Sequence, residues 1–282
     1  MAIFYLIIGS IIISFSPILV KLIDLGPTWI GFWRSFLAFL VLFIFYLKNR
    51  SPFNRRFIKL TLFAGVAIGL DLFVWHRSIL LSGAGLATVL GNTQVFYMTL
   101  FGVLYLNQPL TKKKIISVLV AFLGVLFICI DPQLEFNQNL PFYLGILFGL
   151  LTGVAYTFYL LTLRKIEIEY DNVSTFNKLM MVYLFCSVLL FFLSSANHEV
   201  TWPDLSQWKW LIALGIGVNI IGWKLISFGL GKVLPSTAGL VLLIQPIGST
   251  LWGFLFFNEK LTINTYIGIL FILMGIFLSQ KK

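Results

Sequence analysis

Charge is what this sequence has least of. Lys, Arg, Asp and Glu make up 11% of its 282 residues, whereas 59% are hydrophobic. Soluble domains carry about 25% charged residues, so a soluble globular fold is excluded. Backbone polar groups in lipid are satisfied only by helices or closed barrels, and a spanning helix needs about 20 apolar residues. The apolar runs here are too long for barrel strands, which predicts an all-α integral membrane protein.

Residues that hold metals or perform catalysis are also scarce. There are two histidines and two cysteines. No HExxH or CxxC motif occurs, Cys129 and Cys186 lie inside apolar runs, and His198 is expected in an outer loop. No span holds a pair of carboxylates, and no P-loop is present. We therefore expect no enzyme activity, no metal, no cofactor and no ATP-driven motor.

Basic residues outnumber acidic ones by 20 to 10, for a net charge of +10. They lie at the ends of apolar runs rather than on one polar surface, which argues against nucleic-acid binding and makes them topology signals. With a cytoplasmic N-terminus, fourteen of the 20 fall inside and five outside, and Lys224 lies within a span. This bias predicts that both termini are cytoplasmic.

Ten apolar runs can be marked, separated by turn residues or charge. They are expected as helices at 3–22, 28–47, 57–81, 85–106, 114–130, 141–163, 174–195, 207–229, 236–257 and 263–279. Pro17 and Pro246 fall inside two of these runs. Proline removes a backbone hydrogen bond, so we expect bends or exposed carbonyls there.

The second half of the chain repeats the first. Residues 69–76 (GLDLFVWH) are echoed by 217–224 (GVNIIGWK), and residues 108–111 (QPLT) by 259–262 (EKLT). Five helices per half would invert the second copy in the membrane, a construction typical of secondary transporters. The predicted repeats are residues 1–131 and 141–282.

Two motifs carry a family resemblance. Residues 32–38 (FWRSFLA) and residues 258–262 (NEKLT) with the following helix resemble signatures of the EamA-type transporters of the drug/metabolite transporter superfamily. The resemblance implies ten transmembrane helices, as two inverted five-helix repeats around a central cavity. It also implies export or exchange of small metabolites, often amino acids, across a bacterial inner membrane.

Ionisable residues within spans are functional candidates by default, because lipid penalises their charge. Asp71 and Asn219 should lie near mid-membrane, followed by Trp75-His76 and Trp223-Lys224 on opposite sides of the midplane. The two tryptophans would be aromatic walls, and His76 and Lys224 polar handles, the alternative for Lys224 being that its long side chain only reaches toward the inner interface. Asp71 would bind a cation or, like His76, accept a proton. The alternative is that Asp71 pairs with Arg77 or His76 and only fixes the fold.

Uncharged polar residues complete the candidate binding site. Buried amides both donate and accept hydrogen bonds, which suits a polar or zwitterionic solute, although they also serve as contacts between helices. These further candidates are Asn92, Gln94, Tyr97, Tyr156 and Gln245.

A structural pair is expected near the outer surface between Arg34 and Glu259. Their repeat counterparts, Lys178 and Gln108, should lie near the inner surface and have lost their ionic character. Surface ion pairs are weak, so an absence of contact is the competing expectation.

The sequence thus predicts a secondary transporter in a bacterial inner membrane that moves a small polar metabolite, such as an amino acid or amine. It would export or exchange its solute by alternating access, with proton drive left open. Its expected partners are the solute and membrane lipids, as a monomer or weak homodimer. A channel or lipid-handling protein is the alternative, and an embedded enzyme is less favoured.

Overall fold

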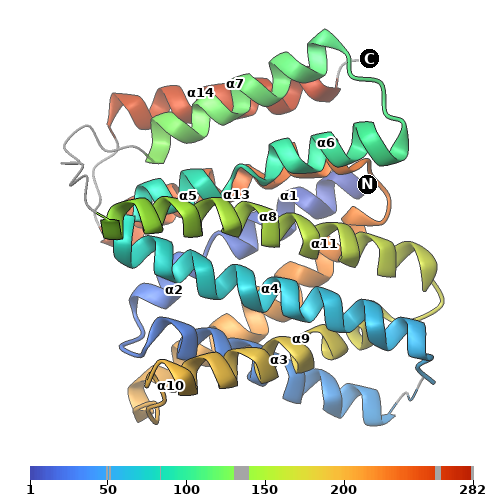
Figure 1. The fold of residues 1–282 in the computed structure, drawn as a ribbon, viewed down its shortest axis with the longest axis vertical. Coiled ribbons are helices and arrows are strands. Elements are labelled where there is room, and N and C mark those ends of the chain that lie inside the picture. Colours follow the sequence, from blue (N-terminus) through green and yellow to red (C-terminus); the bar gives the residue numbers. More distant parts are fainter. Residues whose placement is uncertain (49, 51, 83, 130–139, 258–261, 281–282) are drawn as a thin grey trace.

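The computed structural model describes residues 1–282 except 49, 51, 83, 130–139, 258–261 and 281–282, and every regular element in that part of the chain is a helix (Figure 1). The elements are α1 Ala2–Ile13, α2 Ser16–Lys21, α3 Pro27–Lys48, α4 Arg55–Ser82, α5 Ala84–Gly91, α6 Gln94–Leu106, α7 Lys112–Cys129, α8 Leu140–Glu169, α9 Thr175–Ala196, α10 Leu205–Ile212, the π-helix η1 Ala213–Gly222, α11 Trp223–Leu230, α12 Pro235–Leu242, α13 Ile244–Phe257 and α14 Ile263–Gln280.

Eight helical stretches are long and apolar enough to cross a membrane. They are formed by α1 with α2, by α3, by α4, by α5 with α6, by α8, by α9, by α10 with η1 and α11, and by α12 with α13. A helical membrane fold is therefore confirmed. The other two runs marked in the sequence correspond to α7, which begins with three lysines, and to the shorter apolar helix α14.

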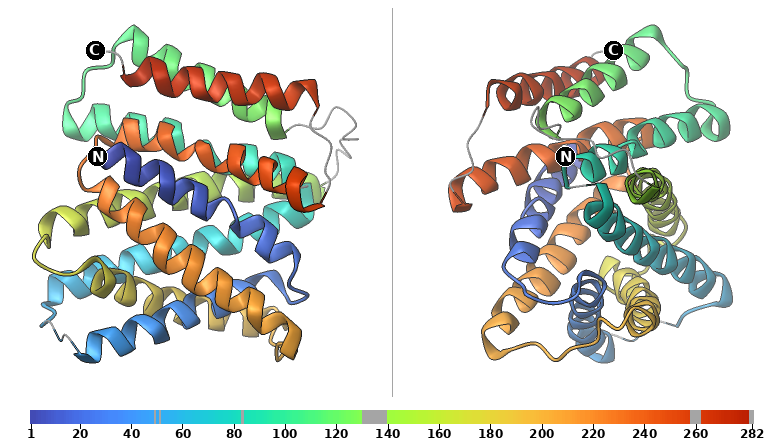
Figure 2. Two further views of the ribbon diagram at one scale, coloured as in Figure 1. Left: turned by 180° about the vertical axis from the view of Figure 1, so that it is seen from behind. Right: turned by 60° about the vertical axis from the view of Figure 1, so that its left-hand side comes forward.

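Helices from the two halves of the chain pack in pairs. In one half of the molecule α3 lies beside α9, and at the opposite end α7 lies beside α14 (Figure 2). Between them, α4 packs along α8, α1 along α11, and α6 along α12. Each pair joins one helix that precedes residue 130 to one that follows residue 139, so the halves are interleaved rather than separate.

Two of the helical breaks occur four residues before a proline. Helix α1 ends at Ile13 and Pro17 follows, and α12 ends at Leu242 and Pro246 follows. In an α-helix the N–H of residue i bonds the carbonyl of residue i−4, and proline has no N–H. The carbonyls of Ile13 and Leu242 therefore lack the N–H that would continue the helix, and each helix ends at that residue. This confirms the interruptions predicted from the sequence.

The break between α5 and α6 has no proline to explain it. Here the side chains of Asn92 and Thr93 donate to the carbonyl oxygens of Thr88 and Leu90, at 2.8 and 2.5 Å. Such local bonds compete with the helical pattern and bend helices. A further departure, the ten-residue π-helix η1, carries Asn219, and π-helical segments are frequent at functional sites.

Small residues allow α8 to approach its neighbours closely. A Cβ built at Gly145 would lie 2.7 Å from the Cβ of Ser82 on α4, and one at Gly149 would lie 2.6 Å from a side-chain atom of Leu90 on α5. Both distances are too short for real atoms. These glycines therefore serve packing within the chain, and they bring α4, α5 and α8 together around the candidate site.

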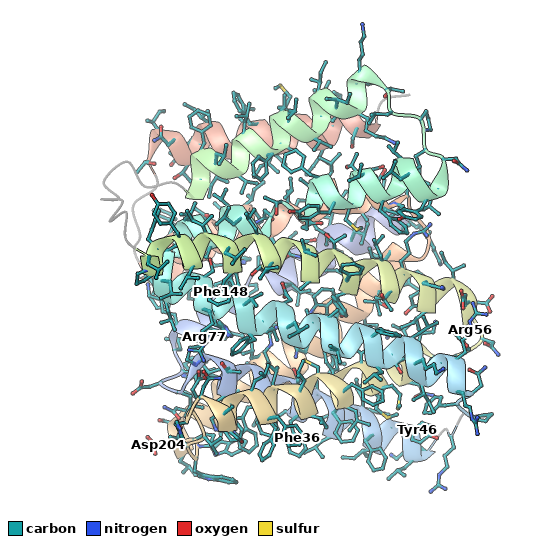
Figure 3. The ribbon with its side chains drawn as sticks, viewed as in Figure 1. Phe36, Tyr46, Arg56, Arg77, Phe148 and Asp204 are labelled. Atoms are coloured by element: carbon teal, nitrogen blue, oxygen red, sulfur yellow. The ribbon has the colours of Figure 1, made fainter. Side chains whose placement is uncertain are left out.

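Charged residues mark the two edges of the molecule that are expected to lie at the two membrane surfaces. Figure 3 shows Arg56 and Arg77, near the two ends of α4, at opposite edges, with Asp204 on the Arg77 side. Helix α1 begins and α14 ends on the Arg56 side (Figure 1). The two ends of the described chain thus lie on one side.

Candidate functional site

Asp71 is a buried acid in the interior of α4, with 9% of its surface exposed. Among the described residues, no hydrogen-bond donor or cation lies within bonding distance of its carboxylate. Arg34 is the cation that acts on it electrostatically, from beyond ion-pair distance. Burying an unpaired carboxylate is costly, so this position has the character of a site awaiting a ligand or a proton.

Arg34 of α3 lies in the core rather than at the outer surface, where the sequence had placed it. Its Nε and Nη2 donate to Oδ1 of Asn219 at 3.0 and 2.7 Å, and its Nη1 donates to Oγ of Ser16 at 3.0 Å. Glu259, its expected partner, lies outside the described residues. The bonds from Arg34 show that it joins α3 to η1 and to the first residue of α2.

Asn219 forms hydrogen bonds through both its side-chain amide and its backbone carbonyl. Its Nδ2 donates to the backbone carbonyl of Arg34 at 3.1 Å, and its own backbone carbonyl accepts from the Tyr183 hydroxyl at 2.6 Å. With both side-chain atoms bonded to Arg34, the amide acts as a structural link between the halves. Tyr183 was missed by the sequence reasoning, because a tyrosine inside an apolar run gives no sign of its distant partner.

Lys178, the sequence counterpart of Arg34, is also buried, but it is ion-paired. Its Nζ lies 2.6 Å from Oε2 of Glu167, and the Ser227 hydroxyl donates to Oε1 of the same carboxylate at 2.5 Å. The expectation that ionic character had been lost here is wrong. It considered only Gln108 as a partner, and Gln108 instead accepts from Ser236 at 2.8 Å.

Neither Arg77 nor His76, the two alternative partners proposed for Asp71, bonds to it. Arg77 forms an ion pair with Glu199 at 2.7 Å, and Glu199 also accepts from the backbone N–H of Thr28 at 2.7 Å. His76 is buried, and its Nδ1 has no hydrogen-bond partner among the described residues. The structure therefore does not support a purely structural pairing of Asp71 with either residue.

Aromatic and amide side chains of the second half form one connected group. Trp223 packs edge-on against Tyr159 and Tyr156, with ring centroids 4.7 and 6.1 Å apart. The Tyr156 hydroxyl accepts from Nε2 of Gln245 at 3.2 Å. The buried Tyr159 hydroxyl has no partner in the described part of the chain. Three predicted site residues from α8, α11 and α13 are thus brought together.

The first-half candidates are less closely joined. Trp75 packs against its neighbour His76 with ring centroids 5.3 Å apart, and it lies close to Gly91 at the end of α5. Gln94 is buried, and its Nε2 donates to the Gly239 carbonyl at 3.2 Å while its Oε1 has no partner among described residues. Gln94 thus bridges α6 and α12 and still offers an acceptor.

Three candidates lie apart from this arrangement. Lys224 is exposed, with its Nζ 4.2 Å from the centre of the Phe176 ring, so it is directed away from the buried polar group. Asn92 donates to the Thr88 carbonyl within its own turn. Tyr97 is half-buried on α6. Among the described residues, none of these three side chains bonds to another candidate of the site.

The candidate residues without a partner define what this region can do chemically. Gln94 Oε1, His76 Nδ1 and the Tyr159 hydroxyl are buried without a hydrogen-bond partner among the described residues. Together with the Asp71 carboxylate they offer acceptors, and the imidazole and the hydroxyl can also donate. A buried carboxylate one helical turn from Trp75 suits an amine, because aromatic faces attract cations. The amide and hydroxyl groups suit a polar remainder of the same ligand.

Comparison with known proteins decides the class. The sequence profile of the EamA-like transporter family matches residues 1–130 and 143–280. The chain belongs to the EamA-like transporter family. Relatives include an uncharacterized transporter of Archaeoglobus fulgidus, 21% identical over 98% of this chain and 95% of its own length, and the transporter YoaV of Bacillus subtilis, 24% identical over 91% and 88%.

One relative with a named cargo is the pseudopaline exporter CntI of Pseudomonas aeruginosa, 22% identical over 90% of this chain and 86% of its own. A crystal structure superposes with a TM-score of 0.82 over 99% of this chain and 97% of the other, at 15% identity. That likeness shows the fold alone. As an EamA-family protein, the chain is a multi-pass membrane transporter.

Proposed function

We propose that this EamA-family transporter carries a small amine-bearing polar solute, with an amino acid or a related compound as the prime case, by alternating access. The observation that carries the proposal is Asp71, a buried carboxylate inside a candidate span with no partner among described residues. A solute ammonium would supply the missing positive charge. Binding of the ammonium would offset the cost of the buried carboxylate, which has no counter-charge while the site is empty.

The transporter's architecture is proposed as ten transmembrane helices in two inverted five-helix repeats, 1–131 and 141–282, around a central cavity. The profile match to each half supports this, as does the pairing of every long first-half helix with a second-half helix. Alternating access would then follow from one repeat rocking against the other.

Roles within the site follow from the contacts. Asp71 would bind the ammonium, and the edges and faces of Trp75, Tyr156 and Trp223 would enclose it. Gln94 and Gln245 would bind polar groups of the solute through their amides. His76, whose Nδ1 has no partner among the described residues, is proposed with Asp71 as a candidate for proton coupling.

Orientation and direction are further parts of the proposal. The excess of basic residues on one side of the ten runs supports cytoplasmic termini in a bacterial inner membrane. The name of the pseudopaline exporter supports export. A pore is less well supported, because a site with a specific unpaired carboxylate is built to hold a ligand.

The test begins with purified protein and a thermal-shift screen of amino acids, amines and carboxylates, because a ligand of the native state raises apparent stability. Hits are then assayed in proteoliposomes for saturable uptake and counterflow. We expect amines and amino acids, but not simple carboxylates, to stabilise the wild type. Unsaturated flux without counterflow would favour a channel and contradict the proposal.

Two variants separate solute binding from proton coupling. If Asp71 binds the ammonium, Asp71→Asn weakens the thermal shift and exchange alike. If it is instead the proton acceptor, Asp71→Asn and His76→Gln abolish flux driven by a pH gradient but retain exchange. Unchanged exchange and unchanged pH dependence in both variants would refute a functional role for either residue.

A further inference from the structure

A long apolar groove runs along the outside of the molecule between α4 and α8. Its volume is roughly 730 Å³, and Phe101 of α6 closes one flank. Phe63 and Phe158, from the two sides of the groove, are 65% and 63% exposed. In a membrane such surfaces face the lipid, so the groove is separate from the buried polar groups of the candidate site.

The groove has the length of a hydrocarbon chain. It follows α4 from Leu60 to Val74 and α8 from Leu151 to Lys165, which is about 21 Å of helix at ~1.5 Å per residue. An extended acyl chain can lie along such a length, with its carboxyl end at one end of the groove.

The chemistry of the groove changes at one end only. Its lining is apolar apart from Thr162 and Lys165, which both lie on the last turns of α8 at the Arg56 edge (Figure 3). Glu169 is 2.9 Å from Arg56 and 3.8 Å from Lys165, so a single carboxylate is shared by two cations. Lys59, one turn along α4 from Arg56, adds a third positive charge.

We propose that this groove binds one acyl chain of an anionic phospholipid from the leaflet at the Arg56 edge, with the phosphate against Lys165 and Arg56. The two cations and one carboxylate at this end leave a net positive charge, and basic residues near a membrane surface attract anionic headgroups. The chain extends over about two-thirds of the ~30 Å hydrocarbon core. This site does not depend on which solute is carried.

The lipid would touch the same two helices that carry the candidate site. Leu70 and Val74 in the groove directly precede Asp71 and Trp75, and Ala155 precedes Tyr156. Neighbouring residues point in different directions from a helix, with 3.6 residues per turn. Occupancy of the groove would therefore stabilise the α4–α8 pair from its lipid side while leaving the site open.

The test is native mass spectrometry of the detergent-purified chain with phosphatidylglycerol and phosphatidylethanolamine added in equal amounts. We expect one phosphatidylglycerol to be retained several-fold more than phosphatidylethanolamine. Lys165→Gln should remove the headgroup preference, and Ala155→Phe, which fills the groove, should reduce retention of both lipids several-fold. Lys48→Gln, at the end of α3 on the same edge, is the matched control and should retain the wild-type pattern.

Equal retention of the two lipids by the wild type would overturn the proposal, as would unchanged retention in both groove variants. An effect of Lys48→Gln as large as that of Lys165→Gln would show mere surface charge and also overturn it. Loss of a dimer in Ala155→Phe would identify a second copy as the occupant. Ala67→Leu, a milder filling of the same groove, replaces Ala155→Phe if the latter is not monodisperse.

Discussion

Arg34 and Lys178 occupy matching positions when the two halves of the sequence are aligned, yet their charges are compensated differently. Lys178 contacts the carboxylate of Glu167, within its own half. Arg34 reaches across to the neutral amide of Asn219, and in the described chain no carboxylate lies within ion-pair distance of it. The nearby acid, Asp71, remains unbonded.

We interpret Lys178 as a structural cation and Arg34 as a cation that affects the candidate site electrostatically. In the second half, the positive charge and the negative charge are already in contact, so neither is available to a ligand. In the first half, Arg34 is held by hydrogen bonds and leaves the Asp71 carboxylate uncommitted. The repeat that keeps its acid unpaired is therefore the one expected to bind the ammonium of the solute.

The largest effect should come from breaking the closed pair. Lys178→Met leaves the Glu167 carboxylate buried without its cation, and breaking a buried pair costs about 3–5 kcal/mol. We expect a corresponding fall in unfolding free energy, measured by denaturation in detergent. The double variant Lys178→Met with Glu167→Gln should recover most of it. A loss below about 1 kcal/mol for the single variant would contradict this account.

A somewhat smaller loss should follow from Asn219→Leu. The change removes the acceptor of two Arg34 hydrogen bonds, and bonds to charged groups contribute about 1.5–3 kcal/mol. We expect stability to fall by about 3 kcal/mol in the same assay. Asn219→Asp keeps the acceptor and should lose less. Equal losses in the two variants would show that the Arg34 contact is not what stabilises this region.

Asp71→Asn should separate stability from binding. No partner among the described residues is lost and a costly buried charge is removed, so the unfolding free energy should not fall. Loss of a charged contact of ~1.5–3 kcal/mol should weaken solute binding about 10- to 150-fold. Thermal shift against solute concentration measures both. Asp24→Asn, an exposed acid outside the spans, is the control. A strongly destabilised Asp71→Asn with unaltered affinity would make Asp71 a structural residue.

The smallest effect is expected for Lys224→Gln. Lys224 loses only its contact with the Phe176 ring, worth about 0.5–1 kcal/mol at an exposed position. Transport by this variant should match the wild type, whereas His76→Gln should be impaired. Equal impairment of the two variants would contradict this prediction and support equivalent roles for His76 and Lys224, as the sequence repeat suggested.

Fold class, family and the two proline breaks could all be predicted from the sequence, because each depends on local composition or spacing. Asp71, Trp223, Tyr156 and Gln245 could be named as candidates on the same basis. The partners of Arg34 and Lys178 could not, since Asn219 and Glu167 are reached only after the chain has folded. The direction of the Lys224 side chain could not be predicted either, because the repeat alignment gives the level of a residue along its helix but not the way its side chain points.

The proline breaks and the π-helix differ in permanence. A proline lacks its N–H in every conformation, so the interruptions before Pro17 and Pro246 are built into the covalent chain and persist throughout any transport cycle. Helix η1 contains no proline, and all its amides can return to α-helical partners. Such a change of hydrogen-bond register would rotate Trp223 about the helix axis, relative to Tyr156 and Tyr159. The two proline breaks are therefore permanent, whereas the π-helix can change its hydrogen-bond register.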